Sequence, residues 1–359
     1  MKKYLLLLTF LSVIGNAQIV RKYSNEFLNI GAGARGLAMG GAVISNQNDV
    51  YAPMWNPAGL TEVESDWQGA AMHAEYFESI AKYDYISFAK ALDSKDGVLG
   101  ISIVRLGVDN ILNTTQMIDS EGNIDYDKIS KFSTSDYAGI ISYAFRPGGN
   151  QKLSVGINAK IVYRNIGKFA NGFGFGFDVG TIYRADSGYQ IGAMLRDATT
   201  TVNFWSINQK ELSAVVNGEE FNPAPKDKME ITMPKLNLGV SKNFEINRDL
   251  ELLPEAGLNI DFAKTAAVIS TDFASISPYL GAELSFQKMI FVRAGLNRFQ
   301  TVTDIEDLKR KVSMQPSAGI GIKYKGLTLD YAITNTGIGG SNYFSNFFSL
   351  KLDMRDFRY

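Results

Sequence analysis

The stretch KLSVGINAKIVYR, residues 152–164, alternates between apolar and polar side chains along its whole length. One face carries Leu153, Val155, Ile157, Ala159, Ile161 and Tyr163, and the other carries Ser154, Gly156, Asn158, Lys160 and Arg164. A period of two is typical of a β-strand whose two faces meet different surroundings. The run exceeds the five or six residues of an average globular strand, so it predicts a long strand of an unusual sheet.

Two further stretches repeat this pattern and show what the two faces are. Residues 172–184 place Phe173, Phe175 and Phe177 opposite glycines and Asp178, and residues 254–262 alternate in the same way. A continuously apolar and aromatic face opposite a face of glycines and charges is typical of a transmembrane β-barrel, whose outside meets lipid and whose inside does not. The 34 glycines and 12% aromatic residues fit this fold class.

Fourteen segments of this kind can be marked along the chain, and an even number is expected of a bacterial single-chain barrel. The predicted strands are 67–76, 83–92, 97–108, 134–145, 152–164, 172–184, 188–196, 231–243, 251–262, 278–286, 289–299, 315–324, 327–335 and 343–354.

The connections between these segments support an antiparallel barrel with a periplasmic amino-terminal segment. Every connection after an even-numbered strand is short, whereas the long ones, 109–133, 197–230, 263–277 and 300–314, all follow odd-numbered strands. Outer-membrane barrels have short periplasmic turns and longer external loops. The last strand places Phe348, Leu350, Leu352 and Met354 on its apolar face, near the aromatic terminus Tyr359. Such an ending resembles the signal that the outer-membrane assembly machinery reads.

The chain begins MKKYLLLLTFLSVIGNAQ, which has the basic start, short apolar run and small-residue end of a secretory signal peptide. We predict a signal peptide over 1–17 with cleavage after Ala17; the alternative is a buried amino-terminal helix. The chain has no cysteine and a net charge of −1, so neither a disulfide framework nor a nucleic-acid partner is expected. Outside the signal peptide no run of apolar residues is long enough for a transmembrane helix.

Residues 18–65 precede the first strand and contain a G-x-G-x-x-G motif from Gly31 to Gly36. This motif binds a dinucleotide only between a buried strand and a helix, with an acidic residue about 20 positions further on. The preceding RKYSNEFL is polar, and Asp49 comes too early. We therefore expect no cofactor here.

The same segment carries a more specific resemblance. FLNIGAGARGLAMGGAVISNQNDVYAPMWNPAGL resembles the amino-terminal signature of the PorV/PorQ family of outer-membrane proteins, within the superfamily of FadL-type long-chain fatty-acid transporters. The matching residues are Gly31, Gly33, Arg35, Gly36, Met39, Gly40, Gly41, Asn56, Pro57, Ala58, Gly59 and Leu60. The detailed match covers about 35 residues, and fourteen strands is also what the superfamily implies.

The resemblance implies that residues 18–65 form a hatch inside the barrel, 66–359. We expect the hatch glycines to adopt positive φ and to pack against lumen-facing side chains. Pro57 should hold Asn56 in an extended conformation, so that its side chain can bond nearby backbone. The alternative is a small-residue helix below the barrel mouth, without a gating role.

The charges on the polar faces are predicted to line the lumen. They are Lys160, Arg164, Asp178, Arg196, Asp261, Glu283, Arg293, Lys323, Asp330, Lys351 and Asp353. Both signs are mixed, so these groups either form a salt-bridged filling or a path for a polar or amphipathic solute. His73 is expected in the lumen beside Glu75; without a cysteine, a second histidine or a carboxylate cluster, neither a metal site nor catalysis is expected.

The predicted external loop 197–230 carries Phe204, Trp205, Leu212, Val215 and Val216 among polar residues. Such a cluster can mark a partner surface or can fold back to cap the barrel mouth. The resemblance implies a protein-docking or shuttle component of type IX secretion in Bacteroidota, whose partners are the translocon or cargo with a sorting domain. The alternatives are a FadL-like channel for hydrophobic or amphipathic small molecules, and a purely structural barrel. Each places the chain in the outer membrane, in contact with its lipid.

Overall fold

The computed structural model describes residues 24–63, 65–92, 97–216, 219–221, 223, 225, 228–303, 309–335 and 343–354. The predicted signal peptide and Tyr359 lie outside this part of the chain. The amino-terminal segment contains the helical turns η2 (Glu26–Asn29), α2 (Ala34–Ala38), α3 (Ala52–Trp55) and η3 (Pro57–Glu62).

Mostly long strands, with a few short ones between them, form the wall of the molecule. They are β1 (Trp67–Tyr76), β2 (Ala81–Ala91), β3 (Gly97–Asn113), β4 (Ser130–Phe145), β5 (Leu153–Ile166), β6 (Ala170–Arg184), β7 (Tyr189–Arg196), β8 (Thr201–Ile207), β11 (Met229–Thr232), β12 (Lys235–Lys242), β13 (Phe244–Glu245), β14 (Leu250–Asp261), β16 (Ser275–Phe286), β17 (Ile290–Thr303), β18 (Arg310–Tyr324), β19 (Leu327–Asn335) and β20 (Phe344–Asp353). The connections hold η4 (Tyr126–Lys128), η5 (Pro147–Gly149), α4 (Gln209–Leu212), β9 (Ala214–Val216), β10 (Glu219–Phe221) and β15 (Ile269–Ser270).

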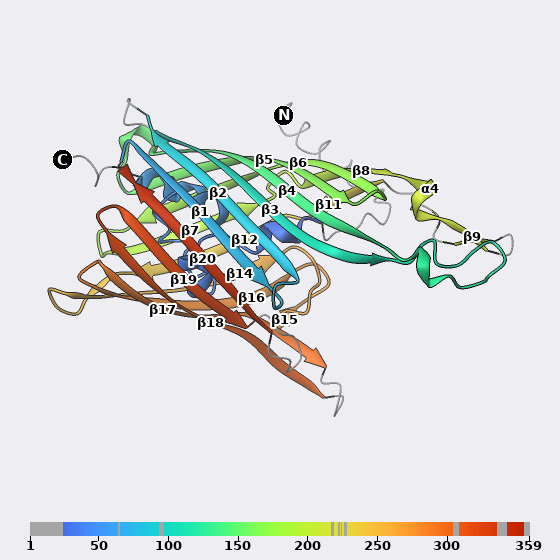
Figure 1. Cartoon of the computed structure of the whole chain (residues 1–359). Coiled ribbons are helices and arrows are strands. Elements are labelled where there is room, and N and C mark those ends of the chain that lie inside the picture. The colour runs from blue at the N-terminus through green and yellow to red at the C-terminus, as the bar shows by residue number, and fades with distance from the viewer. Residues whose placement is uncertain are drawn as a thin grey trace.

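The wall is a closed antiparallel barrel (Figure 1), because β20 pairs with β1 as well as with β19. The short strands β7 and β8 both pair with β6, so together they fill one position of the wall. Their partners β12 and β11 fill the next position, and β13 extends it. In the described residues the wall therefore has fourteen positions, as predicted, and the predicted strands lie within or close to the observed ones.

The outer face of the barrel is apolar. Phe173, Phe175 and Phe177 are 53%, 48% and 43% exposed, whereas Asp178 on the other face of β6 is 3% exposed. Rows of exposed isoleucine on β3, β4 and β5 continue this surface, among them Ile101, Ile141 and Ile157. A closed barrel with this exterior spans the bacterial outer membrane. In the described part of the chain, no helix has the length and apolar character to cross a membrane.

The prediction for β1 is wrong in one respect. His73 was expected in the lumen, but Ala70, Met72, Ala74 and Tyr76 are the buried, inward residues, while His73 is exposed and pairs in register with outward Phe348. The inner side of β1 is apolar because it packs against an apolar amino-terminal segment. His73 instead bonds Asp84 on the outside, with 2.7 Å between Nδ1 and Oδ1.

The segment 197–230 is also not a single loop. Phe204 and Trp205 lie in β8, which pairs with β6 and β11. Phe204 is exposed on the outside opposite Phe173, whereas Trp205 covers Gly172 and has Arg164 stacked 5.2 Å from its ring centroid. Leu212 is half-buried in α4, and Val215 lies in β9. β3 and β4 extend beyond the predicted strands as a long hairpin at the end opposite the short turns (Figure 1).

Candidate functional site

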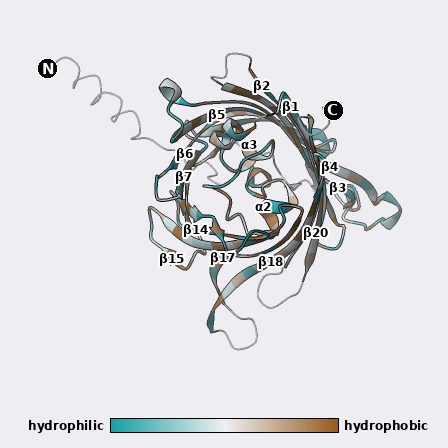
Figure 2. Ribbon diagram, turned by 90° about the vertical axis from the view of Figure 1, so that its left-hand side faces the viewer, coloured by the Kyte–Doolittle hydropathy of each residue, from teal (hydrophilic) through white to brown (hydrophobic). Residues whose placement is uncertain are grey.

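Residues 24–63, which we call the hatch, lie inside the ring of strands (Figure 2). Its centre is Trp55, whose Nε1 donates to the carbonyl of Ala32 at 2.7 Å. A Cβ on Gly31, Gly36 or Gly41 would meet the Trp55 ring, and one on Gly33 would meet Tyr51. The prediction that these glycines pack against lumen-facing side chains is therefore wrong. They pack against the Trp55 and Tyr51 rings inside the hatch instead.

Among the signature glycines, Gly40 does reach the wall. An added Cβ there would lie 3.0 Å from the backbone nitrogen of Leu296. The predicted positive φ is confirmed at Gly31, Gly33, Gly40 and Gly41, with values of 88°, 86°, 63° and 80°. It is wrong at Gly36, which lies within the helix α2. Met39 is fully buried between the hatch and the wall.

The Asn56-Pro57-Ala58-Gly59-Leu60 box folds as its sequence predicts. Asn56 is extended, with φ −154° and ψ 105°, and its side chain accepts from the Ala58 amide at 3.2 Å. Its Nδ2 donates to the carbonyl of Ile44 at 2.8 Å and to that of Thr181 on β6 at 3.0 Å. One side chain therefore joins two parts of the hatch to the wall.

The lumen face of the wall carries a set of glycines on which the hatch rests. We call Gly156, Gly180, Gly192, Gly281 and Gly295 the glycine girdle. Gly156 pairs in register with Gly180, and Gly281 with Gly295. Added Cβ atoms would lie 2.1–2.3 Å from hatch atoms: backbone of Ala58, Ile44 and Met39, and the Asn56 side chain. Glycine is needed here because the hatch backbone approaches the strand backbone closely.

A buried carboxylate fastens the middle of the hatch. Glu255 of β14 is 2% exposed. It accepts hydrogen bonds from the amides of Ile44 and Ser45 at 2.7 and 3.1 Å, from the Ser45 hydroxyl at 2.5 Å and from Asn46 Nδ2 at 2.7 Å. Four hydrogen bonds from the hatch converge on this one buried carboxyl group, so Glu255 is the main polar anchor of this part of the hatch.

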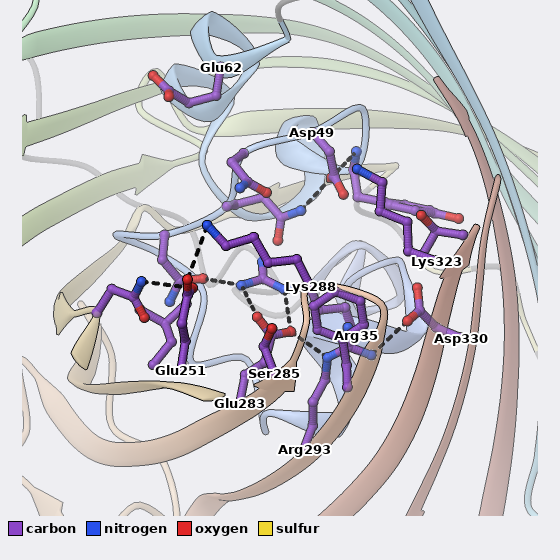
Figure 3. Close-up of a pocket in the computed structure, with 18 of the residues that line it drawn as sticks. Arg35, Asp49, Glu62, Glu251, Glu283, Ser285, Lys288, Arg293, Lys323 and Asp330 are labelled. Atoms are coloured by element: carbon purple, nitrogen blue, oxygen red, sulfur yellow. Dashed lines mark hydrogen bonds and ion pairs between the residues drawn. The ribbon is translucent and has the colours of Figure 1, made fainter. Parts of the chain in front are cut away.

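A chain of ion pairs connects α2 to the wall (Figure 3). Arg35 of the hatch bonds Glu283 of β16, with 2.9 Å between Nε and Oε2. Glu283 also binds Arg293 of β17 at 2.5 Å, and Arg293 binds Asp330 of β19 at 2.6 Å. Each of these charges is largely buried and paired, which offsets the cost of removing it from water. Of the predicted lumen charges, these three wall residues hold the signature arginine in place.

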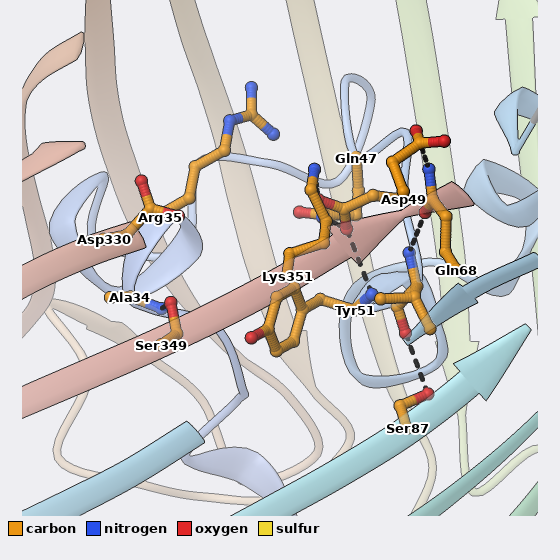
Figure 4. Close-up of polar contacts among 12 residues, drawn as sticks. Ala34, Arg35, Gln47, Asp49, Tyr51, Gln68, Ser87, Asp330, Ser349 and Lys351 are labelled. Atoms are coloured by element: carbon orange, nitrogen blue, oxygen red, sulfur yellow. Dashed lines mark hydrogen bonds and ion pairs between the residues drawn. The ribbon is translucent and has the colours of Figure 1, made fainter. Parts of the chain in front are cut away.

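A second ion pair joins Asp49 of the hatch to Lys351 of β20 (Figure 4), with 2.7 Å between Nζ and Oδ2. Asp49 also accepts from the Tyr51 amide and from Gln47. Burial by itself would raise the pKa of the Asp49 carboxyl, but the Lys351 ammonium, with a smaller contribution from Arg35, lowers this pKa below its ordinary value.

The hatch should therefore loosen in acid. Because the pKa of Asp49 is lower in the docked hatch than in a free one, the docking energy from this pair is present at neutral pH and falls away below about pH 4. We expect single-channel openings in planar bilayers to become more frequent as the pH falls through that range.

The variant Lys351→Met should show such openings already at neutral pH. Lys152→Met, which removes only an exposed pair with Asp186, is the matched control. Openings that increase toward alkaline pH would contradict this assignment.

A third cluster lies where the wall is irregular. Between β7 and β8 the chain bulges, with positive φ at Asp197 and Thr200. Buried Lys160 binds both Asp178 and Asp197 at 2.6 Å, and Asn158 connects Asp178 to the hatch carbonyl of Pro53. Arg196 donates to the hatch carbonyl of Met54. The bulge is thus held by buried charges of the wall, and Asn158 and Arg196 connect this cluster to the hatch.

The remaining predicted lumen charges face the lumen as well. Arg164 binds Asp136 at 3.0 Å, Asp261 lies 3.5 Å from Lys235, and Asp353 accepts from Gln68 at 2.9 Å. Lys323 lines the cavity described next. Sequence reasoning singled out neither Glu255 nor Asp49 nor Asp197. The one sequence feature that could have identified Glu255 is its position on the polar face of its predicted strand.

A polar cavity of about 390 Å³ lies on the short-turn side of the hatch (Figure 3). Its lining includes Arg35, Asp49, Glu251, Lys288, Lys323 and Asp330. Four buried atoms on it, Arg35 Nη1, Gln47 Oε1, Ser285 Oγ and Thr328 Oγ1, have no hydrogen-bond partner among the described residues. Buried polar atoms of this kind bind water or another polar group. We therefore expect the cavity on this side of the hatch to be hydrated.

The opposite side of the hatch is apolar and aromatic next to β1, β2 and β20. Tyr76, Tyr83 and Phe347 face inward there, with ring centroids 5.2 Å apart for Tyr76 and Phe347. Phe27 and Leu28 of the hatch belong to the same buried cluster. The hatch therefore lies between this apolar region and the polar cavity, while the ion pairs of Arg164 and Asp261 line another part of the same side. Among the described residues no group of side chains could hold a metal ion.

Solved structures with the same architecture identify the fold. The monoaromatic hydrocarbon channel CymD matches over 90% of this chain and 98% of its own, with a TM-score of 0.57 at 12% identity. The Ralstonia pickettii toluene transporter TbuX matches over the same shares, with a TM-score of 0.56 at 14% identity. A Pseudomonas aeruginosa FadL homologue matches over these shares too, with a TM-score of 0.51 at 10% identity.

This chain has the FadL-type barrel fold. No protein-family model matches its sequence, and no curated protein matches it. In this FadL-type barrel the hatch, the glycine girdle and the ion pairs form the candidate functional site.

Proposed function

We propose that this barrel admits hydrophobic or amphipathic small molecules across the outer membrane, and that movement of the hatch opens the way. The observation that carries the proposal is the position of the hatch, which fills the lumen between an apolar aromatic region and a polar cavity. An amphipathic solute would meet the apolar side first and would leave through the wet side. CymD is a monoaromatic hydrocarbon channel and TbuX is a toluene transporter, which supports this class of solute.

A reversible lock tests the gating role, because the chain contains no cysteine. Ser45 of the hatch and Ser241 of β12 have their hydroxyl oxygens 2.8 Å apart, so Ser45→Cys with Ser241→Cys can join hatch and wall by a disulfide. We expect whole cells with the oxidised variant to take up a labelled monoaromatic hydrocarbon no faster than cells without the barrel, and reduction to restore uptake.

The control pair is Ser270→Cys with Ser275→Cys, which joins β15 to β16 through hydroxyls 2.8 Å apart. Its oxidation should leave uptake unchanged. If uptake continues with the hatch locked to the wall, hatch movement is not the gate. If neither variant nor the unmodified barrel takes up the probe, this class of solute is wrong.

The second candidate is the docking function that the PorV/PorQ resemblance implies, within type IX secretion. The β3–β4 hairpin, which projects from the barrel (Figure 1), favours it, since Leu112, Ile124 and Tyr126 are 61%, 56% and 70% exposed there. These residues replace the predicted cluster around Trp205 as the candidate partner surface. Recovery of translocon or sorting-domain proteins with the intact barrel, lost in Ile124→Asp, would support docking; co-purification of lipid alone would contradict it.

A further inference from the structure

The outer wall carries a furrow across β14, β16, β17 and β18. Its floor is a row of small outward residues paired in register: Pro254 with Ala282, Ala282 with Ala294, and Ala294 with Ala318. The hollow above the first three of them encloses about 480 Å³ and is almost entirely apolar.

Apart from Ala256, larger apolar side chains form the two banks of the furrow. One neighbouring row consists of Val240, Ala256, Leu280 and Leu296, and the other of Leu252, Leu284, Val292 and Ile320. Leu280, Val292 and Ile320 are 50%, 53% and 56% exposed. The furrow is therefore about as deep as one side chain and as wide as one row of residues. Such a shape suits an extended hydrocarbon chain better than a flat protein surface.

A positively charged side chain, that of Lys242, lies at one end of the furrow. Lys242, the last residue of β12, has its Nζ 4.6 Å from the ring centroid of Tyr189 and 5.6 Å from that of Phe244. Among the described residues no carboxylate forms an ion pair with it. Aromatic rings beside a lysine are typical of the membrane–water interface, so this end lies at the short-turn, periplasmic rim.

The furrow leads from that rim into the membrane. Lys242 lies three residues before Glu245, the end of β13, which continues its strand position, whereas Ala318 lies six residues before the end of β18 at Tyr324. With about 4.8 Å between neighbouring strands, the row from Pro254 to Ala318 is roughly 14 Å long. Because barrel strands tilt by about 35–45°, this row descends roughly 8–10 Å, more than half the depth of one leaflet of a hydrocarbon core of about 30 Å. The dimensions thus match the upper part of a single acyl chain of the periplasmic leaflet.

We propose that this furrow binds one glycerophospholipid of the periplasmic leaflet, with an acyl chain over Pro254, Ala282 and Ala294 and the phosphate beside Lys242. The phosphate supplies the anion that Lys242 lacks, and the chain fills a hollow that loosely packed lipid would fill poorly. This site does not depend on whether the barrel transports a solute.

Native mass spectrometry of the detergent-extracted barrel, titrated with phosphatidylglycerol, tests the proposal. We expect the unmodified barrel to retain one phospholipid at detergent concentrations that remove the rest. Ala282→Leu with Ala294→Leu should fill the floor and reduce this occupancy by about tenfold. Lys242→Gln should weaken binding by about fivefold, as expected for one lysine at a membrane surface.

Two matched variants serve as controls. Ala159→Leu adds the same bulk to an outward alanine of β5, which lies between Ile141 and Phe177, and Lys325→Gln removes a rim lysine that lies beside Tyr324. Both should retain the lipid, and heat-modified gel mobility should show that all variants fold. Equal retention by the furrow variants would overturn the proposal. So would a dimer that only these variants lose, or a retained apolar compound that is not a phospholipid.

Discussion

Replacing Gly281 and Gly295 by alanine should unseat the hatch while the barrel still forms. A Cβ at Gly295 would lie 2.1 Å from the carbonyl carbon of Met39, and one at Gly281 would lie 2.3 Å from its oxygen. Both contacts are with backbone, so a side chain cannot simply turn away. Overpacking of this kind costs about 1–3 kcal/mol per site, so the population of undocked hatch should rise by at least about 30-fold.

Planar-bilayer conductance and limited proteolysis measure this effect. We expect frequent large openings and cleavage within residues 24–63, neither of which should occur in the unmodified barrel. Gly139→Ala is the matched control, because a Cβ at Gly139, on the outer face of β4, meets nothing within 4 Å. A double variant that stays closed and protease-resistant would show that the hatch does not rest on the girdle as described.

Removing the Glu255 carboxylate should release the centre of the hatch. Glu255→Ala leaves the amides of Ile44 and Ser45 and the Asn46 side chain without their acceptor. An unsatisfied buried donor costs about 1–3 kcal/mol, so we expect the docking of the hatch to weaken by about 3–5 kcal/mol, close to the loss of one partner from a buried ion pair.

Hydrogen exchange provides the direct measurement. The amides of Ile44 and Ser45 should exchange at least about 100-fold faster in Glu255→Ala, because 1.4 kcal/mol corresponds to a factor of ten. Glu255→Gln keeps one acceptor and should give an intermediate rate. Glu245→Ala, at an exposed position of β13, should leave both rates unchanged. Protection that persists in Glu255→Ala would assign the anchoring to other contacts.

The sequence predicted the barrel well because the two faces of most strands meet very different surroundings. In β5 and β6 an apolar face lies on lipid, so alternation marks both the strand and its orientation. The length of each long connection predicted on which side of the membrane it lies. Length alone did not show that the β3–β4 and β17–β18 connections continue as strands. Local chemistry was likewise sufficient at Asn56, where the following proline restricts the backbone.

The alternating pattern gave the wrong orientation for β1. It shows that the two faces of a strand meet different surroundings, but it does not show which face points into the lumen. Next to the hatch the lumen is apolar, so Met72 and Tyr76 turn inward and His73 turns out. The hatch glycines were misjudged for a related reason. Whether a glycine lies next to the wall or next to Trp55 depends on how the hatch folds on itself, which no local pattern records.

The sequence by itself determined the strands, the lipid-facing rows, the presence of a glycine-rich hatch segment and the extended conformation of Asn56, since each depends on residues close together in the chain. Only the tertiary structure decided which charges meet. Arg35 and Glu283 are 248 positions apart, and Glu255 is 209–211 positions from the hatch groups that bond it. The furrow on the outer wall has the same origin, because its floor is a row of residues from separate strands that strand register brings side by side.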